Sequence, residues 1–284
     1  QRLAGARQRR RCIDMSVVLQ ISDTHFGTEQ APVVAALLDL ARQLQPDVAV
    51  LSGDITQRAR RSQFAAARRF VDRLQIPTVL AIPGNHDIPL FNLLARVLFP
   101  YANYQREFGA NMEPEFESPA YRIVCLNTTR PTRHKDGVVS REQIGRVARR
   151  LRSASRQQLR IVVTHQPVHV IRAEDVDNLL HGHEEAVRCW ARAGADIIMG
   201  GHIHLPYVHP LNERFAGLPH KVWSVQAGTA VSHRIRERIP NSVNVVRYRA
   251  ADPISSVERW DYDIDAGGFR CVDIERLELD RPHP

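Results

Sequence analysis

The sequence predicts an α/β protein in which helices cover a mixed β-sheet or a pair of packed sheets. Through the first two-thirds of the 284 residues, short β-branched runs alternate with longer segments of helical period, a pattern typical of βα units. Near the C-terminus, apolar and polar side chains instead alternate between turn sequences, which indicates antiparallel strands. The chain is therefore expected to begin as βαβ units and to end in an antiparallel meander.

The expected strands are apolar runs bounded by turn residues or polar residues. Those of the βα part lie at 17–21, 48–51, 78–82, 121–126, 160–164, 197–199 and 221–226. The meander strands lie at 243–248, 257–262 and 269–277, separated by the turns Asp252-Pro253 and Gly267-Gly268.

The expected helices carry apolar residues on one face. They span 32–45, 62–74, 141–151 and 184–193. The second should begin with Ser62 as its N-cap, and the last should end before Gly194.

The composition excludes several classes of protein. Hydrophobic residues make up 43% and charged residues 25%, which is typical of folded globular domains. No apolar run reaches the roughly 18 residues that a membrane-spanning helix needs. The four cysteines are scattered without a CxxC spacing, so we expect a reducing, cytoplasmic location and treat Cys125 and Cys189 as core residues.

The formal net charge is +8, and half of it lies in residues 1–14. We expect this stretch to be a disordered or non-native leader before a single domain at 15–284, with translation beginning at Met15. A basic arm that binds nucleic acid is the alternative interpretation. Because the excess charge is concentrated outside the expected fold, nucleic acid is not the expected partner.

Histidines, carboxylates and one asparagine follow five of the predicted strands. The sequence places Asp23-Thr-His25, Gly53-Asp54, Gly84-Asn85-His86-Asp87, Thr164-His165 and Gly201-His202-Ile-His204 at these strand ends. In open α/β sheets ligands bind outside the carboxyl ends of the strands, so these side chains should meet at one edge.

Seven of these residues form a donor set of oxygen and imidazole ligands without a thiolate: Asp23, His25, Asp54, Asn85, His165, His202 and His204. Such donors suit Mn, Fe, Zn or Mg ions, and seven are too many for one site. Each alone could be a turn residue, a helix cap or a core histidine, but their joint occurrence favours two divalent ions. Asp54 is the candidate bridge because the adjacent glycine allows close approach. The ions would hold a hydroxide that attacks phosphorus.

In this order, the D-x-H, G-D, G-N-H-D, H and G-H-x-H blocks resemble those of the calcineurin-like metallophosphoesterases, from Val17 to about Thr229. The resemblance implies a four-layer sandwich of two mixed β-sheets flanked by helices. It further implies that one metal is held by Asp23, His25 and His204, that the other is held by Asn85, His165 and His202, and that Asp54 bridges them.

The resemblance also implies catalytic roles for two further residues. His86 would protonate the leaving oxygen or steady the phosphoryl charge, and Asp87 would orient it. Within the family, the short loops and the GHIHLP block are most similar to the class III cyclic nucleotide phosphodiesterases. The branch that cleaves UDP-diacylglucosamine commonly has Arg at the position of His86.

The predicted function is hydrolysis of a small nucleotide-like phosphodiester. The five blocks contain no Arg or Lys, which favours diesters over the more highly charged monoesters. One alternative is a lipid-linked or sugar-linked pyrophosphate hydrolase that uses the apolar segment 91–104 as an acyl-contacting wall. That segment could equally cover the sheet edge. Another alternative is a non-catalytic scaffold. Loops 127–129 and 134–140 could line the pocket, whereas His181 and His183 are expected in an exposed loop.

Overall fold

The computed structural model describes residues 15–250 and 254–279. The expectations for the basic leader at residues 1–14, which includes Cys12, fall outside the described residues. Met15, the expected translation start, is the first residue described. The Asp252-Pro253 turn also falls outside the described residues.

Two six-stranded mixed sheets form the centre of the structure. In the first sheet, strands follow the spatial order β12 (Gly268–Glu278), β11 (Ile254–Asp263), β10 (Ser242–Tyr248), β1 (Ser16–Ile21), β2 (Val48–Ser52) and β3 (Thr78–Ile82). In the second, the order is β4 (Glu115–Glu117), β5 (Tyr121–Cys125), β6 (Leu159–Val163), β7 (Ile197–Gly200), β9 (Trp223–Gln226) and β8 (Tyr207–Pro210). The pair of sheets and the meander of β10–β12 confirm the predicted fold class.

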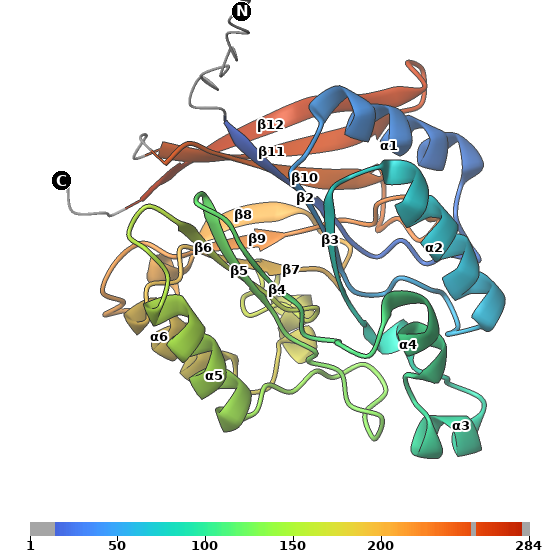
Figure 1. The fold of residues 1–284 in the computed structure, drawn as a ribbon, viewed down its shortest axis with the longest axis horizontal. Coiled ribbons are helices and arrows are strands. Elements are labelled where there is room, and N and C mark those ends of the chain that lie inside the picture. Colours follow the sequence, from blue (N-terminus) through green and yellow to red (C-terminus); the bar gives the residue numbers. More distant parts are fainter. Residues whose placement is uncertain (1–14, 251–253, 280–284) are drawn as a thin grey trace, which may run out of the picture.

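Helices cover the outer face of each sheet, which gives four layers (Figure 1). Over the first sheet lie α1 (Ala31–Leu44) and α2 (Arg61–Leu74), and over the second lie α5 (Arg141–Arg152) and α6 (His183–Arg192). The helix α2 begins one residue earlier than expected, so Ser62 is not its N-cap. The N-cap is Arg60, whose backbone amide donates to the Gln63 side-chain oxygen at 3.4 Å, and the amide of Arg58 donates to the same oxygen at 2.9 Å.

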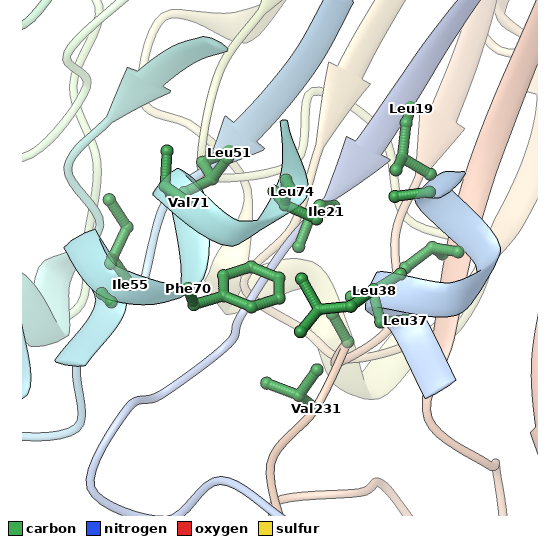
Figure 2. Packing of buried hydrophobic residues seen from close by; sticks show 14 of the residues in the cluster. Leu19, Ile21, Leu37, Leu38, Leu51, Ile55, Phe70, Val71, Leu74 and Val231 are labelled. Carbon is green, nitrogen blue, oxygen red and sulfur yellow. The ribbon is translucent and has the colours of Figure 1, made fainter. Parts of the chain in front are cut away.

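Alternation along β1 shows how one strand serves two apolar layers. Leu19 and Ile21 face α1 and α2, where they pack with Leu37 and Phe70 (Figure 2). Val18 faces the opposite way, into the apolar interior between the two sheets. The strand is therefore buried on both faces, as expected of a central strand in a layered α/β fold.

Two strands, two α-helices and three 3₁₀ helices of the described residues were absent from the sequence prediction. The 3₁₀ helices are η1 (Asn85–Asp87), η2 (Ala173–Asn178) and η3 (Leu211–Glu213). The strands β4 and β8 are short sheet edges, and β8 pairs only with β9 among the described strands. The apolar segment after the GNHD block forms α3 (Leu93–Leu98) and α4 (Ala102–Phe108). Its two parts behave differently, because Tyr104 is buried against Phe64 whereas α3 has no buried residue.

Candidate metal centre

The predicted ligand residues meet where the carboxyl ends of strands from both sheets come together. Buried Gln20 at the end of β1 holds the two sheets together there. Its amide nitrogen donates to the Ser52 hydroxyl at 3.2 Å and to the Gly200 carbonyl of the opposite sheet at 3.0 Å. Loops that follow β1, β2 and β3 therefore face loops that follow β6 and β7, as the strand-end pattern predicted.

Asp23, His25 and His204 form a first group whose ligand atoms lie within 4.8 Å of one another. The Nε2 atoms of the two histidines are 3.1 Å apart, and His204 Nε2 lies 3.3 Å from an Asp23 oxygen. His204 Nδ1 lies 2.6 Å from the Arg234 carbonyl oxygen, which can only accept, so Nδ1 carries a proton. The Nε2 lone pair of His204 is thereby turned into the cluster, as in a metal ligand.

Asp54, His165 and His202 form a second group, whose ligand atoms also lie within 4.8 Å of one another. His165 Nε2 lies 3.3 Å from an Asp54 oxygen and 3.3 Å from the Asn85 side-chain oxygen. His165 Nδ1 lies 2.9 Å from the Ser52 carbonyl, which fixes the ring in the same manner. The buried Nδ1 of His202 has no hydrogen-bond partner among the described residues, which is the situation a metal ion would resolve.

Asp54 lies between the two groups and presents a different oxygen to each. Its Oδ1 is 3.3 Å from His165 Nε2, and its Oδ2 is 3.8 Å from His25 Nε2. The backbone amide of His86 donates to Oδ1 at 2.8 Å, which holds the carboxylate in this orientation. The donor set and its arrangement therefore fit two divalent cations with a shared carboxylate.

The backbone around the cluster is strained. Most of the predicted ligand residues have a positive φ although none is glycine: Asp23 (51°), His25 (43°), Asp54 (49°), His202 (75°) and His204 (54°). Such conformations cost free energy for L-residues and gather at functional sites, where the surrounding structure holds them in place.

Two glycines allow the loops to approach one another. A Cβ at Gly53 would lie 2.3 Å from His165 Nδ1, and one at Gly84 would lie 2.1 Å from the backbone nitrogen of Asp54. Any side chain at either position would push apart the loops that carry the ligands.

The electrostatics keep the carboxylates charged and two histidines neutral. Burial by itself would raise the pKa of Asp23, but His204 and His165 lower it to about 2. Burial also opposes ionisation of Asp54, yet His165 and His86 hold its pKa well below the usual value. Burial lowers the pKa of His25 and of His202 to about 3. Charged carboxylates and neutral imidazoles are the forms that bind metal ions.

The neighbouring carboxylates favour protonation of the other two histidines. Burial lowers the pKa of His165, but Asp54 more than offsets this and brings it to about 9. Asp23 likewise raises the pKa of His204 against the effect of burial. Metal ions compete with protons for imidazole nitrogens, so metal binding by these two histidines would depend on pH.

Asp87 does not orient His86, contrary to the expectation. Its carboxylate accepts from the backbone amides of Gly84 (2.9 Å), Ile55 (3.0 Å) and Thr56 (2.8 Å), and from the Thr56 hydroxyl (2.8 Å). Burial, followed by the charge of Asp54, raises the pKa of Asp87 to about 7. Asp87 thus ties the loop after β3 to the loop after β2.

His86 is held instead by residues outside the five blocks. Its Nδ1 lies 3.0 Å from the Gln57 carbonyl, and its Nε2 lies 2.9 Å from a guanidinium nitrogen of Arg234. Its ring also packs edge-on against His25, with the ring centroids 4.9 Å apart. The sequence prediction missed Arg234, which lies in the loop after β9. Since β9 is parallel to β7, the strand-end rule applied to β9 would have pointed to this loop.

A cleft of about 420 Å³ opens over the cluster. It is lined by Asp54, Asn85, His86, His134, Lys135, Asp175, Asn178, His202, Ile203, His204, Arg234 and Arg236. Three cationic side chains thus reach the cleft from loops outside the blocks. Arg236 is paired with Asp175 at 2.9 Å, whereas Arg234 and Lys135 have no carboxylate partner among the described residues. The absence of Arg and Lys from the blocks is therefore a weak argument about substrate charge.

The other candidate residues fall into two groups. His134 and Lys135 of the 134–140 loop line the cleft. The loop 127–129 does not, and its Thr128 hydroxyl instead donates to Gln166 at 2.6 Å. His181 and His183 lie outside the cleft lining, and His183 Nδ1 lies 2.8 Å from the Leu180 carbonyl.

The calcineurin-like phosphoesterase family model matches residues 16–206, which include all five blocks. The chain belongs to the calcineurin-like phosphoesterase family. A probable cyclic nucleotide phosphodiesterase of Synechococcus sp. is 27% identical over 67% of this chain and 74% of its own length. A probable glycerophosphodiester phosphodiesterase of Arcobacter nitrofigilis is 23% identical over 66% and 71%, respectively.

Solved structures of low sequence identity share the fold of this phosphoesterase. A dimetal phosphatase from Danio rerio superimposes with a TM-score of 0.65 at 13% identity, covering 93% of this chain and 99% of that one. Purple acid phosphatase PPD1 from yellow lupin gives a TM-score of 0.71 at 14% identity and covers 94% of this chain. The chain spans only 54% of the lupin protein.

Proposed function

We propose that this phosphoesterase is a binuclear metal-dependent phosphodiesterase that hydrolyses a nucleotide-like phosphodiester. The observation that carries the proposal is the position of Asp54, whose two oxygens face His165 in one ligand group and His25 in the other. A single metal ion would leave one of these groups of buried charged and polar side chains without its partner.

The proposed ligand sets are those expected from the sequence. Asp23, His25 and His204 hold one divalent ion, Asn85, His165 and His202 hold the other, and Asp54 bridges them. Ions of Mn, Fe or Zn suit these donors. When bound, they supply the Lewis acidity that activates water and neutralises the phosphoryl oxygens.

His86 is the proposed proton donor to the leaving oxygen. The Gln57 carbonyl can only accept, so Nδ1 of His86 carries a proton, and Nε2 accepts from the Arg234 guanidinium at 2.9 Å. To act as the acid, Nε2 would first take up a proton from solvent as Arg234 turns to the substrate, and would then pass that proton to the leaving oxygen. Arg234 lies next to Nε2, where its guanidinium can bind a non-bridging phosphoryl oxygen. Asp87 is a positioning residue for the loops that carry Asp54 and Asn85.

Support for a diester substrate comes from the names of the two relatives, which describe hydrolases of cyclic nucleotides and of glycerophosphodiesters. The cleft volume of about 420 Å³ is in the range of small-molecule sites. No helix in the described part of the chain is long and apolar enough to span a bilayer. The shared interior of the two sheets supports one domain from residue 15 onward. A cytoplasmic location remains part of the proposal, and the three cysteines in the described part of the chain are free thiols.

The test is a screen of the full chain reconstituted with Mn, Fe or Zn. The substrates are a bis-aryl phosphodiester, an aryl phosphomonoester, cyclic nucleotides and a UDP-linked lipid. We expect the diesters to be turned over best. Preference for the UDP-linked lipid would favour the pyrophosphate alternative, and metal binding without any turnover would favour the scaffold alternative.

A further inference from the structure

The segment 91–99, which we call the apolar tip, exposes side chains that a folded chain normally buries. The exposed fractions are 80% for Phe91, 70% for Leu93, 71% for Leu94, 76% for Val97, 55% for Leu98 and 68% for Phe99. These six are nearly half of the thirteen strongly exposed large hydrophobic residues in the described part of the chain. A concentration of this kind marks a surface that contacts something other than water.

The tip is built with its charged side chain turned inward. Arg96, the only charged residue of the segment, donates to the carbonyls of Pro131 (2.6 Å), Pro89 (3.1 Å) and Arg133 (2.6 Å). These bonds fix the short helix α3 to the protein body with its apolar side outward. Figure 1 shows α3 projecting at one corner of the molecule.

Basic loops flank the tip on two sides. The loop before α2 carries exposed Arg58 and Arg60, and exposed Arg61 begins the helix. The Arg58 guanidinium lies 5.2 Å from the centre of the Phe91 ring. The loop that receives Arg96 carries exposed Arg133 and Lys135. Within this second loop, Asp136 is the acidic neighbour, 3.6 Å from Arg133. In these two segments the cationic side chains therefore outnumber the acidic one.

We propose that the apolar tip docks the protein on the surface of an anionic lipid bilayer. Phe and Leu side chains beside Arg and Lys are the combination that binds peripherally at the headgroup level, and each basic residue near an anionic surface adds to the attraction. A second copy of this chain fits less well, because a two-fold contact between tips would bring the arginine loops of both copies together. The docking does not depend on the proposed reaction.

Sedimentation of the full chain with lipid vesicles tests the proposal. We expect binding to vesicles of phosphatidylcholine mixed with phosphatidylglycerol, weaker binding to phosphatidylcholine alone, and release by added salt. The double variant Leu94→Ser/Val97→Ser should lower the partition coefficient by at least about tenfold. The variant Arg58→Ser/Arg61→Ser should lower binding to the mixed vesicles only.

Ile264→Ser is the matched control, since Ile264 is 82% exposed in the turn after β11 and should bind lipid as the unaltered chain does. Hydrolysis of a water-soluble aryl diester should be unchanged in the variants of the tip. Binding that the double variant leaves intact, or equal binding to both kinds of vesicle, would overturn the proposal. A dimer in sedimentation velocity that Leu94→Ser/Val97→Ser dissociates would assign the tip to self-association instead.

Discussion

The ligand cluster buries charged side chains, whereas the apolar tip, which begins five residues after His86, exposes hydrophobic ones. Asp23 has no exposed surface and Asp54 is 2% exposed, while Phe91 is 80% exposed. Burying a charge without a partner costs free energy, and exposing a contiguous apolar surface favours association. In each region the side chains lie where a folded protein usually does not place them, and this indicates what the region binds. The buried charges indicate metal cations, and the exposed apolar side chains indicate a lipid surface.

The two regions also differ in how firmly the chain holds them. In the cluster, carbonyls of Ser52 and Arg234 fix the histidine rings, and the surrounding hydrogen bonds hold backbone conformations that are unfavourable for L-residues. The tip is held by the three hydrogen bonds of a single side chain, Arg96. A site for chemistry needs this preorganisation, whereas a surface that docks does not.

The largest expected effect is the loss of the carboxylate at the centre of the cluster. Asp54→Ala should lower kcat by about 10³-fold or more and reduce the bound metal, because the shared anion between two cations is removed. Steady-state kinetics and elemental analysis measure both effects. The control Asp72→Ala removes an exposed carboxylate that pairs with Arg68 on α2 and should change neither. Full metal content with unchanged kcat in Asp54→Ala would refute the bridging role.

Replacing His86 should separate proton transfer from metal binding. His86→Ala is expected to keep its metal content and to lose about 10² to 10⁴ in kcat, the usual size of a general-acid contribution. The matched control is His181→Ala, since His181 is exposed and lies outside the cleft lining. A parallel loss of metal in His86→Ala would show that His86 is a ligand.

The sequence indicated which residues belong to the ligand cluster because each of the five blocks directly follows a predicted strand. Carboxyl ends of parallel strands share an edge within each sheet, which places the block after β1 with that after β2, and the block after β6 with that after β7. Asp23 and His204 meet because the two sheets face each other at these edges, a contact that the strand-end pattern alone does not give. The meander was equally readable from its alternation. Edge strands β4 and β8 were missed because they are short and contain no buried residue, so they lack the apolar run that revealed the equally short strand β7.

Other features depend on contacts that no local pattern encodes. Arg234 reaches His86 from a loop 148 residues away in sequence. Asp87 follows His86 directly, yet its carboxylate is turned toward the amides of Ile55 and Thr56. The apolar character of 91–99 was visible in the sequence, but its exposure was not, since apolar residues usually indicate packing.

Arg234 should affect the choice between monoesters and diesters more than the overall rate. Arg234→Gln is expected to lower kcat/KM for an aryl phosphomonoester by about tenfold, because the extra negative charge loses a charge-assisted hydrogen bond. The loss for the paired diester should be smaller. Arg238→Gln changes an exposed arginine of the same loop and is the control. Equal losses on both substrates would mean that Arg234 acts only by holding His86.

The smallest expected effect is that of Leu94→Ser on the free energy of unfolding. Comparison with Phe64→Ala distinguishes the exposed tip from the buried core. Leu94→Ser should change the free energy of unfolding by no more than about 0.5 kcal/mol, because Leu94 is 71% exposed and packs little. Phe64→Ala should lower it by about 3 to 5 kcal/mol, since Phe64 is fully buried against Tyr104 and Phe108. Urea unfolding followed by circular dichroism measures both. A loss above about 2 kcal/mol in Leu94→Ser would show that the tip is packed against the protein in solution, and it would then be unavailable for docking.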